Sequence, residues 1–229
     1  MRHTSAVSAG PATTALWQVA SDPSRAAALH GLVGEFCHLL RNRLNSLQMG
    51  LYLARHGCDS ATRDAGVWDE LDGHYRAAEK VVDLFQIICR PMTLTRIPVG
   101  LGLVLNEFSS RWAPRFAGRN TALVVDLADA DGPSCLDPSR LAIGLDALAS
   151  WRIDRAQPGR TIHLRGWVEQ GRSRLEWSEA DSLPDDGGAL PLAALARVAS
   201  AHGGSISEET RDGWSVRLDW PHGVSLVSA

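Results

Sequence analysis

Residues 35–46 carry side chains whose types and spacing suit phosphate chemistry. His38 is followed by Arg41 and Asn42, three and four residues later, and these spacings place side chains on one face of an α-helix. A neutral imidazole nitrogen can attack an activated phosphoryl group, and the ordinary pKa of histidine leaves that nitrogen free near neutral pH. Arg41 could stabilise phosphate charge, and Asn42 could orient the imidazole or a hydrolytic water.

A long amphipathic helix is predicted around His38. Apolar residues recur at steps of three and four across residues 24–56, which is the pattern of one helix face. At about 100° per residue, His38 lies about 200° from both Phe36 and Leu40 and therefore outside the apolar stripe. Its side chain is expected to face solvent, where an ordinary helix residue without any chemical role would also lie.

A second long helix is predicted over residues 61–89, where apolar residues again recur at helical spacing. Pro91 ends this helix because proline cannot continue it and restrains the residue before it. Two helices of about thirty residues with a short connection form an antiparallel hairpin. A hairpin cannot bury its own apolar stripe, so the sequence predicts a homodimer in which two hairpins form a four-helix bundle.

Downstream of Pro91 the pattern changes to short strands mixed with helices, separated by glycine and proline turns. Strands are predicted over residues 93–99, 121–127, 134–136, 161–169, 173–178, 205–209 and 214–220, and helices over 101–116, 137–151 and 190–201. Antiparallel strand pairs with helices on one face form an α+β sandwich. The predicted organisation is a flexible leader (1–22), a dimerising hairpin with His38 (23–90), the sandwich domain (91–221) and a tail (222–229).

The composition excludes several classes of function. The 229 residues carry a net charge of -3, so no basic field points to nucleic acid. No apolar run approaches the ~20 residues that span a bilayer, and the N-terminal residues do not form a secretory signal. The four cysteines lie far apart without C-x-x-C spacing, which argues against a zinc site or a disulfide framework. We therefore expect a cytoplasmic protein with reduced thiols, bound to neither nucleic acid nor membrane.

Several stretches, in this order along the chain, resemble the histidine-kinase superfamily. Residues 38–44 (HLLRNRL) keep the His, Arg, Asn and Leu of the family motif His-Glu/Asp-x-Arg-Asn/Thr-Pro-Leu. Residues 137–141 (DPSRL) are similar to its Asp-Pro-x-Arg-Leu helix start, and residues 195–206 to its closing helix, Gly-Gly turn and strand. The resemblance covers about residues 24–221, and it implies a dimerising hairpin followed by an ATP-binding α/β sandwich.

The family's ATP-binding motifs are not matched. The helix after Arg140 contains no Asn, where the family has one that holds magnesium. Residues 177–184 (WSEADSLP) correspond to the motif Asp-x-Gly-x-Gly, which supplies an adenine-binding carboxylate, yet they contain no glycine. Leu39 replaces the acidic residue that the resemblance implies as the base for attack on ATP, and Arg43 replaces proline. Because transfer from ATP depends on positioning and on metal, we expect neither a nucleotide nor a metal cofactor.

The combination resembles histidine phosphotransferases of the ChpT type, which pair a dimerising hairpin with a degenerate ATPase-like domain and have no sensor domain. This resemblance implies a phosphorelay of a two-component system, in which His38 accepts phosphate from a receiver-domain aspartate and passes it to another receiver. Magnesium is then expected only in the partner receiver domain. The catalytic residues assigned are His38, Arg41 and Asn42, and the docking residues assigned are Leu39, Arg43 and Asn45.

Two alternatives use the same resemblance. In the first, the protein is a non-enzymatic pseudokinase, an adaptor that docks receivers or kinases without becoming phosphorylated. In the second, it is an active histidine kinase with a divergent nucleotide site. We expect His74 and His202 to be structural, and Asp137 to cap a helix rather than to bind a metal.

Overall fold

The computed structural model describes the chain at residues 21–22, 24–25, 37–38, 40–42, 44–52, 54, 65–127, 133–155, 157–180, 189–210 and 213–223. The chain divides into two compact units. We call Pro23–Pro91 the helical unit, and Met1–Asp22 together with Met92–Ala229 the sandwich unit. Their boundary falls at Pro91, the proline at which the sequence predicts the end of the second helix.

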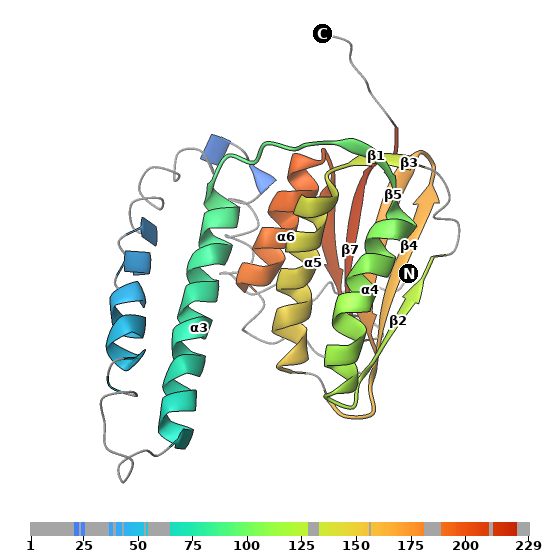
Figure 1. Cartoon of the computed structure of the whole chain (residues 1–229). Coiled ribbons are helices and arrows are strands. Elements are labelled where there is room, and N and C mark those ends of the chain that lie inside the picture. The colour runs from blue at the N-terminus through green and yellow to red at the C-terminus, as the bar shows by residue number, and fades with distance from the viewer. Residues whose placement is uncertain are drawn as a thin grey trace, which may run out of the picture. The chain divides into compact units, whose positions relative to one another are not determined.

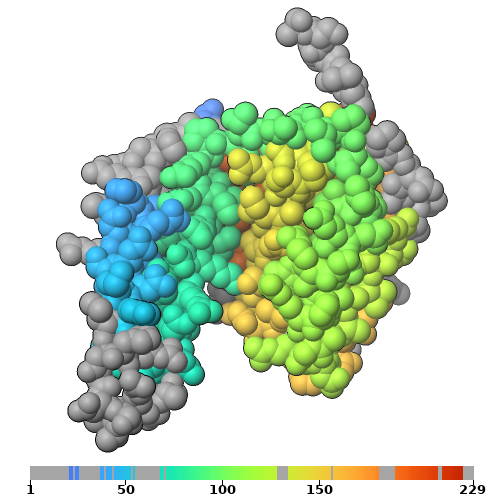
Figure 2. Space-filling model, viewed as in Figure 1, coloured from blue at the N-terminus to red at the C-terminus, as the bar shows by residue number. Residues whose placement is uncertain are grey.

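The helical unit contains α3 (Ala65–Cys89) and a helical segment before it. Residues 37–54 are helical wherever they are described, and Figure 2 shows this segment, in blue, packed along α3, in teal. A small apolar cluster joins the two, with Cys37 and Leu44 from the first segment and Tyr75 and Val82 from α3. Residues 55–64 lie outside the described part, so the antiparallel hairpin stays a prediction.

The sandwich unit is built on a five-stranded mixed sheet in the order β2-β4-β5-β7-β6. Its strands are β2 (Ala122–Asp126), β4 (Thr161–Glu169), β5 (Arg172–Glu179), β6 (Ser205–Glu209) and β7 (Trp214–Pro221). A separate two-stranded sheet pairs β1 (Ile97–Gly100) with β3 (Pro133–Leu136). The helices α4 (Leu101–Ala117), α5 (Pro138–Ile153) and α6 (Ala189–Ala201) cover one face of the large sheet (Figure 1).

The predicted α+β class is confirmed, with two differences in detail. The strand predicted over residues 93–99 begins only at Ile97, because the Thr95 N–H donates to the Asp137 carboxylate at 2.7 Å instead of joining a ladder. The pair β2–β4 is parallel, whereas the sequence analysis considered antiparallel pairs alone. Parallel neighbours need a crossover connection, and here α5 lies between β2 and β4 in the chain.

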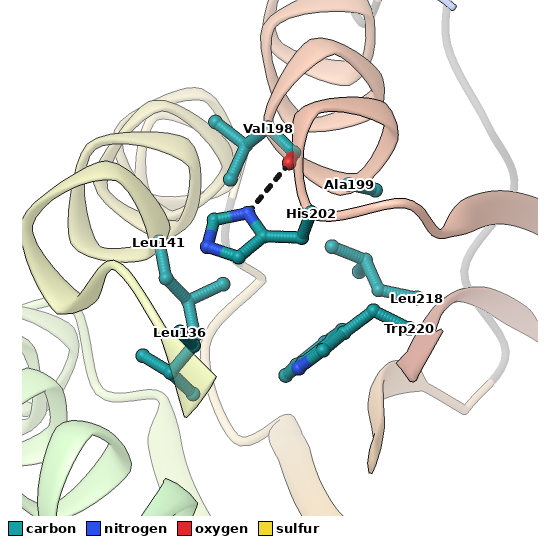
Figure 3. A pocket seen from close by; sticks show the side chains of 7 residues that line it. All are labelled: Leu136, Leu141, Val198, Ala199, His202, Leu218 and Trp220. Carbon is teal, nitrogen blue, oxygen red and sulfur yellow. Dashed lines mark hydrogen bonds between the residues drawn. The ribbon is translucent and has the colours of Figure 1, made fainter. Parts of the chain in front are cut away.

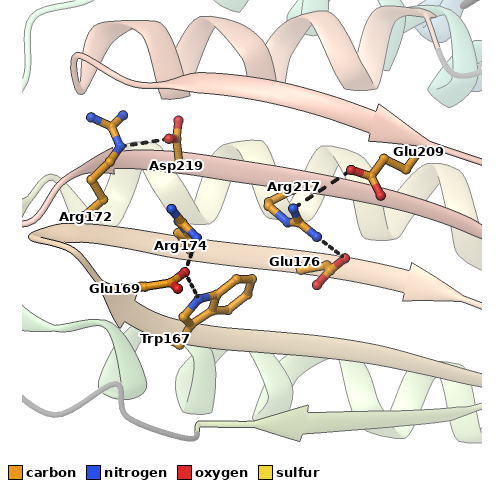
Figure 4. Close-up of polar contacts among 8 residues, drawn as sticks. All are labelled: Trp167, Glu169, Arg172, Arg174, Glu176, Glu209, Arg217 and Asp219. Atoms are coloured by element: carbon orange, nitrogen blue, oxygen red, sulfur yellow. Dashed lines mark hydrogen bonds and ion pairs between the residues drawn. The ribbon is translucent and has the colours of Figure 1, made fainter. Parts of the chain in front are cut away.

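The two faces of the large sheet differ because side chains alternate along each strand. In β7 the inward residues Trp214, Val216, Leu218 and Trp220 are buried against the helices. The opposite face carries charged cross-strand neighbours, such as Arg217 with Glu176 at 3.2 Å and Arg172 with Asp219 at 2.8 Å (Figure 4). This face is nearly balanced in sign, which is what a solvated antiparallel surface requires. No helix in the described part of the chain is long and apolar enough to cross a membrane.

Candidate functional site

His38 lies exposed on the first helical segment, where the helical periodicity places it. Its Nε2 atom is 3.2 Å from the Nδ2 atom of Asn42, one turn further along the helix. An amide NH2 group can only donate, so this contact requires Nε2 to accept with its lone pair and places the ring proton on Nδ1. The contact therefore places the accepting nitrogen of His38 on the helix surface.

Arg41 shares the helix face of His38, and its side chain is bound by a residue of α3. Its guanidinium forms an ion pair with Asp83 of α3, and both side chains are partly exposed. Such a pair contributes little to stability in water, but it fixes where the arginine lies. Asp83 could not be predicted from the sequence as a partner of Arg41, because an acid 42 positions away gives no local signal.

Cys37, the neighbour of His38, is buried and does not compete as a nucleophile. Its Sγ atom lies 4.0 Å from the carbonyl oxygen of Val82. Burial raises the pKa of the Cys37 thiol above its ordinary value, although the positive charge of Arg41 opposes this effect. Because only the thiolate is strongly nucleophilic, the buried Cys37 is a poor nucleophile.

The predicted docking residues are only partly described. Asn45 is exposed, and its Oδ1 atom accepts a hydrogen bond from the Tyr75 hydroxyl at 3.5 Å. Leu39 and Arg43 lie outside the described residues. The structure thus brings His38, Arg41 and Asn42 together on one helix surface and adds Asp83 beside them.

Asp137 caps α5, as the sequence predicts. Its Oδ1 atom accepts from the backbone N–H of Arg140 at 3.0 Å, and its own N–H donates to Nε2 of His202 at 3.0 Å. Among the described residues, no group of histidine, cysteine, aspartate and glutamate side chains is arranged to hold a metal ion. The Asp137 carboxylate accepts hydrogen bonds from the backbone N–H groups of Arg140 and Thr95.

His202 is structural, as predicted, and both of its ring nitrogens are used. Nδ1 donates to the carbonyl oxygen of Val198 at 2.8 Å, while Nε2 accepts from Asp137. The ring lies 6.3 Å from that of Trp220, in a small apolar pocket between α5, α6 and β7 (Figure 3). Burial lowers the pKa of His202 below its ordinary value of 6.5, and a ring whose Nε2 accepts a hydrogen bond is in its neutral form.

The stability of the sandwich unit is expected to fall as the pH drops below 6.5, the ordinary pKa of histidine. In that range unfolded His202 takes up a proton while folded His202 does not, so the unfolded state binds more protons. This stability is fully present above pH 6.5 and is lost as the pH approaches the lowered pKa of the folded state. Urea unfolding at a series of pH values measures the slope, and His202→Gln should reduce it. An unchanged slope in that variant would assign the effect to another group.

Known proteins similar to this chain were found among solved structures. No protein-family model matches the chain, and no curated protein gives a significant match. Full-length ShkA in complex with AMPPNP is 15% identical with a TM-score of 0.69, over 85% of this chain and 46% of that chain. This chain thus spans about half the length of ShkA.

Two further solved structures are named as histidine kinases. ThkA in complex with the response regulator protein TrrA is 14% identical with a TM-score of 0.65, over 95% of this chain and 68% of that chain. AdeS from Acinetobacter baumannii is 16% identical with a TM-score of 0.61, over 82% of this chain and 98% of that chain. At these identities the likeness concerns the fold, and the chain therefore has a histidine-kinase-like fold.

Proposed function

We propose that this protein is a histidine phosphotransferase of a two-component phosphorelay, which accepts phosphate on His38 from one receiver domain and passes it to another. The observation that carries the proposal is the exposed imidazole of His38, with Asn42 at its Nε2 atom, on a histidine-kinase-like fold. The structure of ThkA holds a response regulator, which supports receiver domains as the partners of this chain.

The chemistry needs little from this chain beyond a presented nucleophile. The Nε2 lone pair of His38 forms a bond to phosphorus while the bond from phosphorus to the aspartate oxygen breaks, and the bonding electrons return to the released carboxylate. In the tautomer with the ring proton on Nδ1, which a hydrogen bond from Asn42 requires, no base is needed before the attack. This accounts for a reactive histidine followed by Leu39 rather than by an acid. Asn42 must release Nε2 when the receiver docks, so it acts as a positioning residue.

We infer that neither a nucleotide nor a resident metal takes part. The phosphoaspartate of a receiver is already activated and brings its own magnesium, so proximity supplies most of the remaining rate enhancement. The absence of an Asn along α5 after Arg140 supports this, since transfer from ATP depends on metal ligands at the phosphates.

A homodimer through the helical unit is part of the proposal. Large apolar side chains remain exposed in this unit: Leu47 at 61%, Met49 at 60% and Tyr52 at 57% on the first segment, with Val81 at 42% on α3. Exposed large apolar side chains favour association, and packing against a second copy in a four-helix bundle would bury those that face it.

Leu47→Glu is expected to weaken this dimer at least about tenfold, because a charge would replace an apolar side chain at the interface. Sedimentation equilibrium over a range of concentrations measures the effect. Leu103→Glu, at a residue of the sandwich unit that is 65% exposed, is the matched control and should leave the mass unchanged. Equal behaviour of the two variants would contradict a dimer through the helical unit.

The test of the function is transfer from phosphorylated receivers to this chain. Wild-type protein is expected to acquire acid-labile, base-stable phosphate, and His38→Ala to acquire none. His74→Ala, at an exposed histidine of α3, is the matched control and should be labelled like the wild type. Failure of every cognate receiver to label the intact protein would reject the proposal.

The adaptor role is the second candidate, and the Arg41–Asp83 ion pair favours it. An arginine held by α3 is not free to clamp a phosphate on His38. An adaptor would bind receivers with equal affinity before and after His38→Ala, with no label in either protein. Receiver binding measured together with labelling therefore separates the two functions.

A further inference from the structure

A buried ion pair joins the end of α5 to the end of β5 in the sandwich unit. Arg152 Nε lies 2.7 Å from Glu179 Oε1, and Arg152 Nη2 lies 2.5 Å from Glu179 Oε2. The geometry is bidentate, with both carboxylate oxygens engaged by one guanidinium. The side chain of Arg152 is 4% exposed and that of Glu179 is 11% exposed, so both charges are removed from water.

Aromatic side chains complete the surroundings of this pair. The indole N–H of Trp177 donates to Glu179 Oε1 at 2.8 Å. The guanidinium of Arg152 lies 4.8 Å from the ring centres of both Trp151 and Trp214. These two rings meet edge to face, with centroids 5.3 Å apart. The arginine is therefore held by a carboxylate and by two aromatic faces at the same time.

The Arg152–Glu179 pair lies in the two stretches that correspond to nucleotide-binding motifs of histidine kinases. Arg152 is the second-last residue of α5, and Glu179 is the last residue of β5. The resemblance to histidine kinases aligns α5 with the helix that carries their magnesium-binding Asn, and it aligns residues 177–184 with the motif that supplies their adenine-binding carboxylate. Glu179 is the acidic residue in the described part of that stretch. Its side chain is paired with Arg152 and not directed at a ligand. Trp214 stands opposite Glu179 in the β5–β7 ladder and covers the same end of the sheet.

We propose that the Arg152–Glu179 pair and its tryptophans seal this end of the sandwich, so that the unit is complete without a nucleotide and excludes one. The inference rests on the proposed function in one respect: a sealed sandwich leaves another protein as the source of phosphate for His38. Arg152 and Glu179 thus determine the choice of phosphate donor. They act by closing a site, and they take no part in the transfer itself.

The buried pair predicts how single and double substitutions of Arg152 and Glu179 change the stability of the protein. Removing one charge leaves the other buried without its partner, which is far more costly than exchanging both for apolar groups. Glu179→Met or Arg152→Met alone is expected to raise the equilibrium constant of unfolding by roughly 10²- to 10³-fold. The double variant should recover most of that loss, because two methionines fill similar volume without buried charge.

A surface pair provides the matched control for this cycle. Arg174 and Glu169 form an ion pair on the outer face of the β4–β5 hairpin, between partly exposed side chains (Figure 4). Their exchange for methionine, singly and together, should change the unfolding constant by less than about fivefold at each step. Urea unfolding followed by tryptophan fluorescence measures both cycles in the full chain.

Nucleotide exclusion is tested separately with magnesium and ATP on the wild-type protein. We expect no shift of the unfolding midpoint at millimolar nucleotide, since a ligand that binds the folded state alone must raise it. A concentration-dependent rise would overturn the proposal, and so would a cycle whose single variants are as mild as those of the surface pair. The nucleotide result stands even where single variants do not fold.

Failure of the proposed seal can be distinguished from failure of the proposed phosphotransfer function. Labelling of His38 by phosphorylated receivers reports on phosphotransfer, whereas nucleotide binding and the methionine cycle report on the seal. A labelled protein that binds ATP would retain the function and lose the seal. An unlabelled protein with the expected cycle would retain the seal and lose the function.

Discussion

Gly204→Ala is expected to destabilise the sandwich unit by at least about 3 kcal/mol, through a clash that no side-chain movement can relieve. A Cβ atom at this position would lie 1.9 Å from the backbone oxygen of Asp219 and 2.8 Å from Cβ of Trp220. Both atoms belong to β7, which pairs with β6 directly after Gly204. The two backbones would have to separate, and the pairing of an edge strand would be lost with them.

Gly203→Ala is the matched control, because the same change at the neighbouring residue strains the backbone conformation without causing a clash. Gly203 has φ of +78° and open space around it, with its nearest atom, a Pro221 carbon, at 4.0 Å. It ends α6 in a left-handed cap in which Gly203 N–H donates to Ser200 and Gly204 N–H donates to Ala199. A left-handed alanine costs about 1 kcal/mol.

Thermal or urea unfolding measures the difference between the two glycine variants. The structure requires Gly204→Ala to be the more damaging by at least about 2 kcal/mol. A reversed order would show that β7 does not approach this glycine so closely in solution.

Asp137→Ala is expected to cost about 2–3 kcal/mol, because one buried carboxylate serves two separate backbone donors. Its Oδ1 atom caps α5 by accepting from Arg140 N–H, and its Oδ2 atom accepts from Thr95 N–H at 2.7 Å. Alanine would leave both donors without these partners. Loss of a cap alone typically costs about 1 kcal/mol, so the larger figure tests whether the Thr95 contact contributes.

Asp137→Asn separates the two contributions, since its amide oxygen can still cap α5 while its NH2 group cannot accept from Thr95. We expect this variant to lose about half as much stability as Asp137→Ala. Asp126→Ala, which breaks a surface pair with Arg165 at 3.5 Å, should cost less than about 1 kcal/mol. Equal losses in Asp137→Asn and Asp137→Ala would mean that the Thr95 contact carries the stability, while no loss in Asp137→Asn would mean that the cap carries it.

Much of the fold could be predicted from local patterns. The periodicity of residues 101–116 gave a helix that the structure extends by one residue, and the strand over residues 161–169 has the predicted bounds. Asp137-Pro138 marked the start of α5 because an acceptor side chain followed by proline suits a helix N-terminus. These features depend on neighbours within a few residues, which a single sequence displays directly.

Pairings between distant residues could not be predicted in this way. The partners Arg41 and Asp83 are 42 residues apart, and Arg152 and Glu179 are 27 apart. Each of these residues, considered alone, looks like an ordinary surface charge. The parallel pairing of β2 with β4 was missed for the same reason, because strand direction depends on the path of the chain between the strands.

The shared surface of His38 and Asn42, one turn apart, could be predicted from the sequence, because helical periodicity fixes which side chains lie on one face. The side chains that surround that face come from distant positions, so only the folded chain shows them. The tertiary structure placed Asp83 against Arg41, and it paired Glu179 with Arg152 in the interior of the sandwich unit. A buried charge such as that of Arg152 requires a partner, and packing brings that partner from elsewhere in the chain.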